Sequence, residues 1–320
     1  MHQVTDPEPL ALRLHKEVLR LRLSEMALAR EYKKQTMRTP CHFGVGQEAV
    51  AVGVCQALEL GDAVYSHHRC HNHYLARGGS LEKLAAELYG REGGCSGGRG
   101  GSVHLTARDT GFIASTAILG QCISLAAGSA LAFKMDKKPN VAVAFFGEGA
   151  GDEGVMWETF NYASLNKLPV IFVCENNGYA TETKQPKETD LCRRARAFGL
   201  DTMPLDGNDV IGAHQMAGWA RVTALTSGPV FLECFTYRWL EHVGPNYDHE
   251  SGRTYRTKAE FDEWWMRDPV PVSELAATMD SDFGIDDLRR MRNAISLDVD
   301  NAIEAAKLSP FPTELMADVW

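Results

Sequence analysis

The sequence lacks the features that mark secreted, membrane-spanning and nucleic-acid-binding proteins. Its 320 residues contain no apolar run near the roughly eighteen that cross a bilayer, and its amino terminus has no apolar stretch typical of a secretory signal. Basic residues are also scarce, since 33 Lys and Arg stand against 42 Asp and Glu and leave a net charge of −9. Without a basic run, this charge argues against sequence-independent nucleic-acid binding. We therefore expect neither nucleic acid nor a membrane among its partners.

The sequence also has no Cys-x-x-Cys pair, no internal repeat and no low-complexity linker. Its 8 cysteines are scattered, and in a chain of this length they indicate the reduced thiols of a cytoplasmic protein. Hydrophobic residues make up 44% of the chain, which is enough for a substantial core and argues against disorder. Because no change of composition marks a boundary, we predict a single domain over residues 1–320, with residues 270–320 as an approximate helical carboxyl-terminal extension.

What the sequence does contain is an alternation of buried-strand and helix patterns. Short apolar runs typical of buried parallel strands occur at 141–146, 169–174 and 229–234. Helical spacing of apolar residues is found over 10–33, within 41–58, and over 81–89, 120–135, 153–166, 209–226 and 285–307. The segment 184–197 has no clear apolar period, so we expect a surface loop there. The pattern predicts an α/β fold with a doubly wound, mostly parallel sheet and helical amino- and carboxyl-terminal extensions.

Two polar motifs follow two of these strands directly. The first strand ends in GEGAG (147–151), and the second ends in ENNGY (175–179). Glycines allow the backbone to approach an anionic ligand closely, and the carboxyl ends of parallel strands meet at the edge where such sheets bind ligands. Oxygen ligands from Glu148 and Asn177, completed by phosphate oxygens, suit Mg²⁺. A Gly-Glu-Gly sequence alone is an ordinary strand-to-helix turn, but the second motif at this spacing favours the metal and phosphate interpretation.

This pair of motifs resembles the thiamine diphosphate motif. More narrowly, the chain is similar to the α subunit of the heteromeric, thiamine diphosphate-dependent E1 component of 2-oxo acid dehydrogenases of the pyruvate and acetoin type. Family-like segments run over nearly the whole chain: GQEA (46–49), HRCHNH (68–73), GRGGSVH (98–104), AILG (117–120), LDGND (205–209), TYRW (236–239) and SPFP (309–312).

The resemblance implies thiamine diphosphate and Mg²⁺ as cofactors, together with a set of site residues. It implies Glu148, Asn177 and the Tyr179 carbonyl as metal ligands, and His242 and His71 as catalytic residues. The implied cofactor-binding residues are the metal-binding residues together with His68, Arg69, Ala117, Leu119, Gly147, Gly149, Ala150 and His242. The chain departs from the family pattern in one metal ligand, because Glu148 stands where the family has Asp, one methylene shorter.

The histidine-rich segment 67–73 allows three interpretations. Histidine and cysteine at short spacing are possible Zn²⁺ ligands, although Arg69 places a positive charge among them. An exposed polar loop is the second possibility. The third is a diphosphate contact through charge-assisted hydrogen bonds, which suits an Arg and His cluster and is the role that the resemblance implies for His68 and Arg69.

The segment 237–245 carries the second departure. The resemblance implies that His242 lines the route to the reactive thiazolium carbon, whereas a structural hydrogen-bond donor is the alternative. Glu241 stands where the family has Gly, and it would raise the pKa of His242 if it contacts the imidazole. Val243 replaces the Ser that kinases phosphorylate in mitochondrial relatives, so this control is not expected here.

The resemblance therefore predicts the α subunit of an E1 enzyme. It would decarboxylate a short, pyruvate-like 2-oxo acid or cleave acetoin, and pass the C2 unit to a lipoyl-bearing E2 or another carrier protein. In the family the β subunit supplies the pyrimidine-binding domain and the activating Glu, so we expect activity only in an α2β2 heterotetramer. The mostly polar residues expected at the site favour a small donor. One alternative is a transketolase-like transfer from a ketose phosphate, since 152–158 resembles a transketolase segment. The other is an inactive structural or regulatory homologue.

Overall fold

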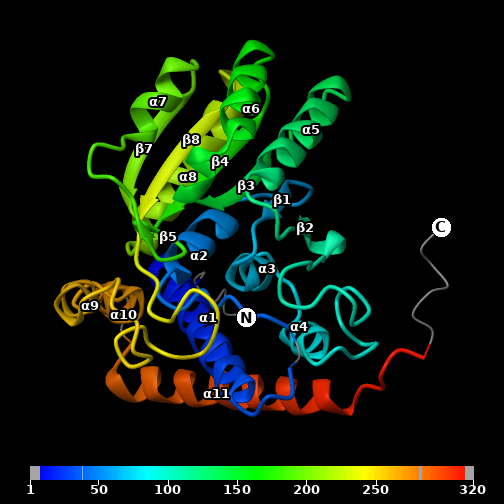
Figure 1. Ribbon diagram of the computed structural model, residues 1–320, viewed down its shortest axis with the longest axis vertical. Helices are drawn as coiled ribbons and strands as arrows, with labels where there is room; N and C mark the ends of the chain where they lie inside the picture. Colours follow the sequence, from blue (N-terminus) through cyan, green and yellow to red (C-terminus); the bar gives the residue numbers. More distant parts are fainter. Residues whose placement is uncertain (1–7, 38, 281–282, 314–320) are drawn as a thin grey trace, which may run out of the picture.

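A six-stranded parallel sheet forms the centre of the computed structural model, which describes residues 8–37, 39–280 and 283–313 (Figure 1). Its strands are β1 Ala63–Ser66, β2 Phe112–Ser115, β3 Ala142–Gly147, β4 Val170–Asn176, β7 Asp201–Asp206 and β8 Val230–Phe235. They lie in the order β2-β1-β3-β4-β8-β7, and every neighbouring pair is parallel. A separate antiparallel pair, β5 Tyr179–Ala180 and β6 Thr183–Lys184, follows β4 directly. The predicted doubly wound parallel sheet is confirmed.

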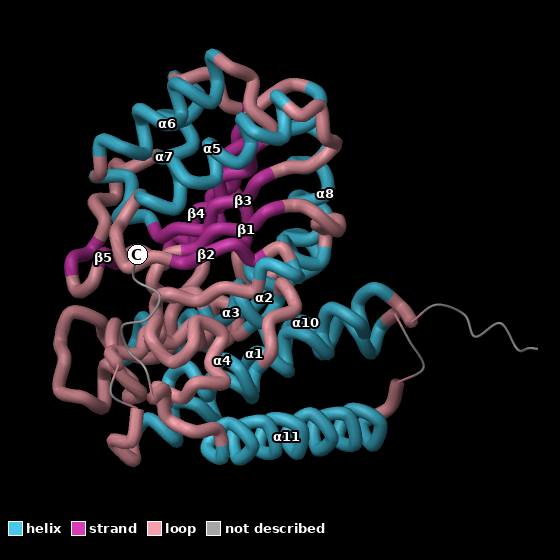
Figure 2. Tube along the Cα trace, turned by 90° about the vertical axis from the view of Figure 1, so that its right-hand side faces the viewer, coloured by secondary structure: helices cyan, strands magenta, loops and turns pink. Residues whose placement is uncertain are grey.

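The described helices either cover the two faces of this sheet or pack beyond one of its ends. They are α1 Leu10–Tyr32, α2 Glu48–Gln56, α3 His71–Ala76, α4 Leu81–Leu88, α5 Gln121–Met135, α6 Gly154–Leu165, α7 Leu191–Ala197, α8 Val210–Thr226, α9 Lys258–Trp265, α10 Pro269–Met279 and α11 Ile285–Leu308, with 3-10 turns at Arg108–Thr110 and Glu148–Asp152. Figure 2 shows α5, α6 and α7 on one face and α8 on the other, while α1, α10 and α11 pack together beyond one end of the sheet.

The strands are apolar throughout because both of their faces are buried. Along β3, Val143 and Phe145 belong to the core on the side of α8, while Ala144 and Phe146 belong to the core under α5 and α6. Successive side chains point to opposite faces of a strand, so a strand covered on both sides reads as a continuous apolar run. This is the reason that β3, β4 and β8 could be predicted from the sequence.

Close helix packing depends on small residues. Gly53 of α2 faces Ala213 of α8, and a Cβ atom added at Gly53 would lie 2.6 Å from the Ala213 Cβ. The α5 helix similarly buries Ala126, Ala127 and Ala130 against the sheet. The two helices can therefore lie near their neighbours only because these side chains are absent or short.

The prediction for residues 184–197 is wrong, because part of this segment is the helix α7. The Asp190 side chain caps it by accepting a hydrogen bond from the Arg193 backbone N–H at 2.7 Å. Only Leu191, Cys192 and Ala195 are buried, which is too few residues to give a recognisable apolar period. The edge strands β2 and β7 and the short strand β1 were not predicted. None of the described helices is long and apolar enough to cross a membrane.

The predicted terminal helical extensions correspond to α1 at one end and to α10 and α11 at the other. Residues 281–282 and 314–320 of the carboxyl-terminal extension lie outside the described part of the chain. The division of the chain into domains stays a prediction.

The order of the strands defines a switch point in the sheet. The chain leaves β1 and next enters the sheet as β2 on one side, whereas it leaves β3 and enters β4 on the other side. In open α/β sheets a crevice forms at the carboxyl ends of the strands at such a point. The segments after β1, β3 and β4 therefore meet at one place.

Candidate active site

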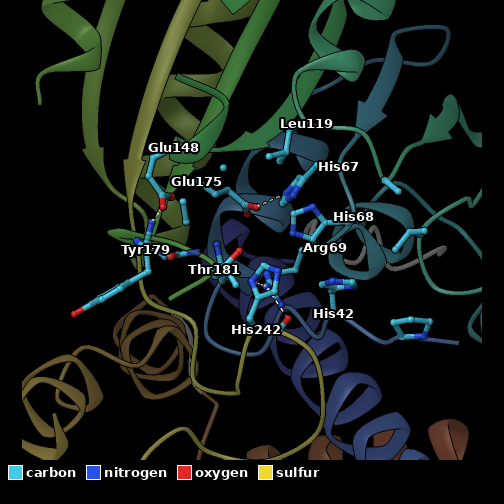
Figure 3. Close-up of a pocket in the computed structure, with 18 of the residues that line it drawn as sticks. His42, His67, His68, Arg69, Leu119, Glu148, Glu175, Tyr179, Thr181 and His242 are labelled. Atoms are coloured by element: carbon cyan, nitrogen blue, oxygen red, sulfur yellow. Dashed lines mark hydrogen bonds and ion pairs between the residues drawn. The ribbon is translucent and has the colours of Figure 1, made fainter. Parts of the chain in front are cut away.

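A cavity of about 410 Å³ lies at the carboxyl ends of β1, β3 and β4 (Figure 3). Most of the residues predicted from the sequence line it: His68, Arg69, Ala117, Leu119, Gly147, Glu148, Gly149, Asn177, Tyr179 and His242. They come from segments that lie far apart in the sequence, and the sheet brings them together. Ala150 and His71 do not line this cavity.

The two polar motifs contact each other directly. Glu148 accepts a hydrogen bond from the Asn177 backbone N–H through Oε2 at 3.2 Å, while its Oε1 is buried without a hydrogen-bond partner. The Asn177 side-chain Oδ1 accepts from the Tyr179 backbone N–H at 3.2 Å, which closes a tight turn around Gly178, whose φ is +79°. Burial raises the pKa of Glu148, and the backbone N–H groups of Glu148 and Asn177 oppose that rise. A buried carboxylate with a free oxygen is the arrangement expected of a cation ligand.

Three imidazoles form the opposite wall of the cavity. The ring of His68 lies 4.7 Å from that of His42 and 5.5 Å from that of His242, measured between centroids. Burial, followed by the positive charge of Arg69, lowers the pKa of His42 to about 2 and of His242 to about 3. Burial, followed by His67 and Arg69, also lowers the pKa of His68. These imidazoles are therefore neutral at neutral pH.

Arg69 is the buried cation of this wall, with 4% of its surface exposed. Its Nη1 donates to the Phe43 carbonyl at 2.7 Å and its Nη2 donates to the His242 carbonyl at 3.1 Å. Burial and the nearby Arg238 and Arg256 lower its pKa well below the usual value. No carboxylate of the described residues hydrogen-bonds to Arg69. Such a cation beside a cavity is suited to an anionic ligand.

Glu175 lies deeper, between the rings of His67 and His73. Its Oε2 is 3.4 Å from His67 Nε2, and its Oε1 is 3.2 Å from His73 Nε2. Burial alone would raise the pKa of Glu175, but the two histidines lower it to about 2. His67 and Glu175 reach the cavity, whereas His73 stacks on Phe145 with ring centroids 4.0 Å apart. The histidine-rich segment is thus mostly buried, and the interpretation as an exposed loop is wrong.

His71 was expected at the pocket wall, but it does not line this cavity. Its side chain is fully buried, with Nδ1 2.8 Å from Glu25 Oε1 and Nε2 2.9 Å from Ser102 Oγ. It is the first residue of the short helix α3. Ala150 is likewise 1% exposed and packs in the core under α5 and α6. The prediction that His71 belongs to the pocket wall is therefore wrong. His71 instead forms a buried link between Glu25 of α1 and Ser102 of the glycine-rich loop.

The expected effect of Glu241 on His242 is also wrong. The Glu241 carboxylate accepts hydrogen bonds from the Asn246 side chain at 3.0 Å and from Arg253 Nε at 3.2 Å. It has no hydrogen bond to His242 among the described contacts, and the pKa of His242 is lowered rather than raised. Glu241 instead organises the segment 241–256 beside the cavity.

Several lining residues were not found from the sequence. They are Thr39, Pro40, His42, Gln47, His67, Val103, Glu175, Ala180 and Thr181. Gln47, His67, Val103 and Glu175 lie inside segments singled out in the sequence, although no site role was assigned to these four residues. His42 has no such signal, because it belongs to an irregular segment before α2.

The glycine-rich loop before β2 is held by one buried carboxylate. Glu87 accepts hydrogen bonds from four backbone N–H groups of this loop, at 2.6–3.2 Å. The donors to Oε2 are Ser96 and Gly98, and the donors to Oε1 are Gly100 and Gly101. These bonds position the following residue Val103 at the cavity.

Comparisons with known proteins agree on one family. The model of the dehydrogenase E1 component family matches residues 16–314. The α subunit of acetoin:2,6-dichlorophenolindophenol oxidoreductase from Bacillus subtilis is 34% identical over 98% of this chain and 94% of its own length. The mitochondrial pyruvate dehydrogenase E1 component subunit alpha-1 of Oryza sativa is 37% identical over 94% of this chain and 77% of its own. The pyruvate dehydrogenase E1 component subunit alpha of Rhizobium meliloti is 34% identical over 96% of this chain and 89% of its own.

Among solved structures, a transketolase from Campylobacter jejuni is similar with a TM-score of 0.57 at 18% identity. The match covers 93% of this chain but only 47% of the transketolase, so the chain spans about half the length of that protein. At this identity the likeness concerns the fold alone.

Proposed function

Because the chain belongs to the dehydrogenase E1 component family, we propose that it is the α subunit of a thiamine diphosphate-dependent E1 enzyme that acts on a short 2-oxo acid or on acetoin. The observation that carries the proposal is the pairing of Glu148 and Asn177 across the ends of β3 and β4, opposite the buried cation Arg69. Such a cavity offers oxygen ligands on one side and a positive charge on the other, as a metal-bound diphosphate requires.

The residues fit Mg²⁺. Glu148 has a buried Oε1 without a hydrogen-bond partner, and a Cβ atom at Gly147 would meet only the Glu175 carbonyl, at 4.0 Å. The free carboxylate oxygen, the Asn177 side-chain oxygen and the Tyr179 carbonyl form the proposed metal-binding set. All are hard oxygen donors, which Mg²⁺ prefers, and Gly147 leaves space for diphosphate oxygens to complete the shell.

The other lining residues would orient the cofactor and handle protons. His68 and Arg69 would hold the diphosphate, and the backbone around Ala117 and Leu119 would face the aminopyrimidine ring. When bound, thiamine diphosphate supplies the stabilisation of a carbanion, which protein side chains do not provide. His242 is neutral, and its Nδ1 lies 3.5 Å from Arg69 Nη2, so the tautomer with the proton on Nε2 is favoured. It can therefore donate a hydrogen bond from Nε2.

A partner subunit would complete the site. Ile118 and Leu119, next to the cavity, are 63% and 43% exposed, which is unusual for large apolar side chains beside a ligand site. We propose that a β subunit in an α2β2 assembly covers them, and that a lipoyl-bearing E2 or another carrier accepts the C2 unit. The polar lining favours a small donor, because polar groups left unpaired by a bulky aliphatic donor would cost affinity.

The assembled α and β subunits provide the test. Activity with pyruvate, acetoin, 2-oxoisovalerate and a ketose phosphate would be measured as kcat/KM with an artificial electron acceptor, with and without thiamine diphosphate and Mg²⁺. We expect strict dependence on both cofactors and a preference for pyruvate or acetoin. Turnover without thiamine diphosphate would refute the function, and a preference for 2-oxoisovalerate or the ketose phosphate would refute the donor class.

A further inference from the structure

The cluster of His67, His73 and Glu175 has no role in the proposed diphosphate site. We propose that these three residues form a second cation site, of a two-histidine, one-carboxylate type, that binds Zn²⁺ or a similar borderline divalent metal. The inference does not depend on the proposed function, since none of the three residues belongs to the Glu148 and Asn177 set.

The geometry of the cluster is close to that of a metal shell. One ligand atom from each of the three residues lies within 4.8 Å of the others. Glu175 already has one oxygen 3.4 Å from His67 Nε2 and the other 3.2 Å from His73 Nε2. Two nitrogen ligands of one zinc ion lie about 3.3–3.5 Å apart, because each Zn–N bond is about 2.0–2.1 Å. The separations of Glu175 Oε2 from His67 Nε2 and of Glu175 Oε1 from His73 Nε2 are close to this range.

The cluster also has polar atoms that lack partners. His73 Nε2 and Glu175 Oε1 are buried and face each other without a well-aligned hydrogen bond. The other nitrogen of His73, Nδ1, lies 2.8 Å from Ser66 Oγ. Metal-binding histidines are commonly oriented through their second nitrogen in this way. Ser66 therefore directs His73 Nε2 toward the carboxylate.

Charge and access favour a cation here. The cluster contains one carboxylate and two imidazoles, which matches the ligands of known zinc sites with an open fourth position. His67 and Glu175 line the cavity and His73 lies behind them, so the open position faces the cavity. Among the described contacts the Arg69 guanidinium donates hydrogen bonds to the Phe43 and His242 carbonyls and not to Glu175, so it leaves the carboxylate oxygens open, although its charge acts on both Glu175 and His67.

A second histidine group, His42, His68 and His242, is a less suitable cation site. One candidate ligand nitrogen from each of these residues also lies within 4.8 Å of the others, but the group contains no carboxylate. Arg69 Nη2 lies 3.5 Å from His242 Nδ1, so a metal ion bound by His242 would lie close to a guanidinium. Repulsion between the two cations disfavours this position. The alternative for the first cluster is a simple ion pair of Glu175 with one protonated histidine, and the experiment separates the two.

The test uses the full chain assembled with its partner subunit, freed of metal with a chelator and kept in excess Mg²⁺ without thiamine diphosphate. Calorimetric titration with Zn²⁺ is expected to show about one equivalent per chain, because a preorganised three-ligand site binds zinc tightly. The variant His73→Gln should weaken this binding by more than about tenfold, because loss of a residue that only orients a metal ligand already costs about that much. His42→Gln and His104→Gln, the latter at an exposed histidine, should bind as the parent does.

Anomalous scattering at the zinc edge from crystals of the unaltered protein gives a second measurement that does not depend on a variant folding. A zinc peak between His67, His73 and Glu175 is expected. Absence of zinc binding, or binding that is lost in His42→Gln and retained in His73→Gln, would overturn the proposal. A peak at Glu148 and Asn177 alone would do the same.

Discussion

Asn177 combines two tasks in one side chain, because its oxygen both closes a backbone turn and is positioned as a metal ligand. Replacing Asn177 by Ala should weaken Mg²⁺-dependent binding of thiamine diphosphate by at least about tenfold, since a ligand oxygen is lost. Glu148→Asp should bind at least as well as the parent, because a shorter carboxylate is the family's usual ligand at this position. Calorimetric titration of the assembled enzyme measures both.

The exposed Asn301 on α11 provides the control, because Asn301→Ala changes the same residue type far from the cavity. If Asn177→Ala binds thiamine diphosphate as tightly as Asn301→Ala does, the metal assignment is wrong.

His15 is a fully buried histidine of α1, and its Nδ1 lies 2.9 Å from Ser273 Oγ. Burial and then Arg292 lower its pKa to about 4, below the usual 6.5. The unfolded chain therefore binds a proton at this residue before the folded chain does. The stabilisation is fully present above a pH of about 6.5 and is lost as the pH falls toward about 4, at a cost of about 1–2 kcal/mol between pH 7 and pH 5.

Thermal or urea unfolding of the parent and of His15→Gln across pH 5–7 tests this expectation. The variant should show a shallower decrease of unfolding free energy as the pH falls, because it has no imidazole to protonate. Parallel pH profiles for the two proteins would contradict the prediction.

At the scale of the elements, the segment 241–256 is tied to the β5–β6 turn by charges. Glu241 pairs with Arg253 at 3.2 Å, and Arg253 also contacts Glu182 of that turn. Both segments supply residues of the cavity wall, His242 on one and Thr181 on the other. The pairing therefore links two sides of the cavity.

Glu241→Gln should loosen the segment 241–256, because it removes the charge that attracts Arg253. Hydrogen–deuterium exchange of this segment should become faster, while exchange in β3 and β4 stays unchanged. Glu250→Gln is the matched control, since Glu250 lies in the same segment with its side chain 64% exposed. Equal exchange in the two variants would show that Glu241 has no organising role.

The contact between α2 and α8 depends on a missing side chain. Gly53→Ala should lower the free energy of unfolding by about 1–3 kcal/mol, the usual cost of overpacking, because its Cβ would lie 2.6 Å from Ala213 Cβ. Gly218→Ala on α8 meets no atom within 4 Å and should instead stabilise by about 0.5–1 kcal/mol through better helix propensity. Urea denaturation measures both, and equal effects would contradict the packing argument.

At the scale of the whole molecule, we propose that a partner subunit completes the active site. The purified chain alone should show no turnover with pyruvate or acetoin, and addition of the β subunit should restore it. Ile118→Asp should weaken the association, because a charge would be buried under the partner at a position that is 63% exposed in this chain. Sedimentation analysis of the mixed subunits measures the association.

Leu60→Asp is the control for this change, since Leu60 is 88% exposed in the turn between α2 and β1. Equal association of the two variants would place the partner elsewhere, and turnover by the isolated chain would refute the two-subunit requirement.

The sequence by itself determined the features that depend on neighbouring residues. Strands buried on both faces read as apolar runs, and motif residues that follow them directly must meet at one edge of a parallel sheet. Glu148 and Asn177 could therefore be paired from the sequence, although Ala150, three residues past the end of β3, turned out to be core. The fold class and the pairing of these two motifs followed from such local patterns, whereas several residues that line the cavity, such as His42, did not.

Only the tertiary structure decided which side chains face each other across long separations. Glu241 contacts Arg253 instead of the adjacent His242, and His71 contacts Glu25 on α1 instead of the cavity. The pKa of His242 likewise follows burial and Arg69, a residue 173 positions earlier in the chain. Side-chain direction, desolvation and long-range charge depend on how the elements pack, and no local sequence pattern encodes them.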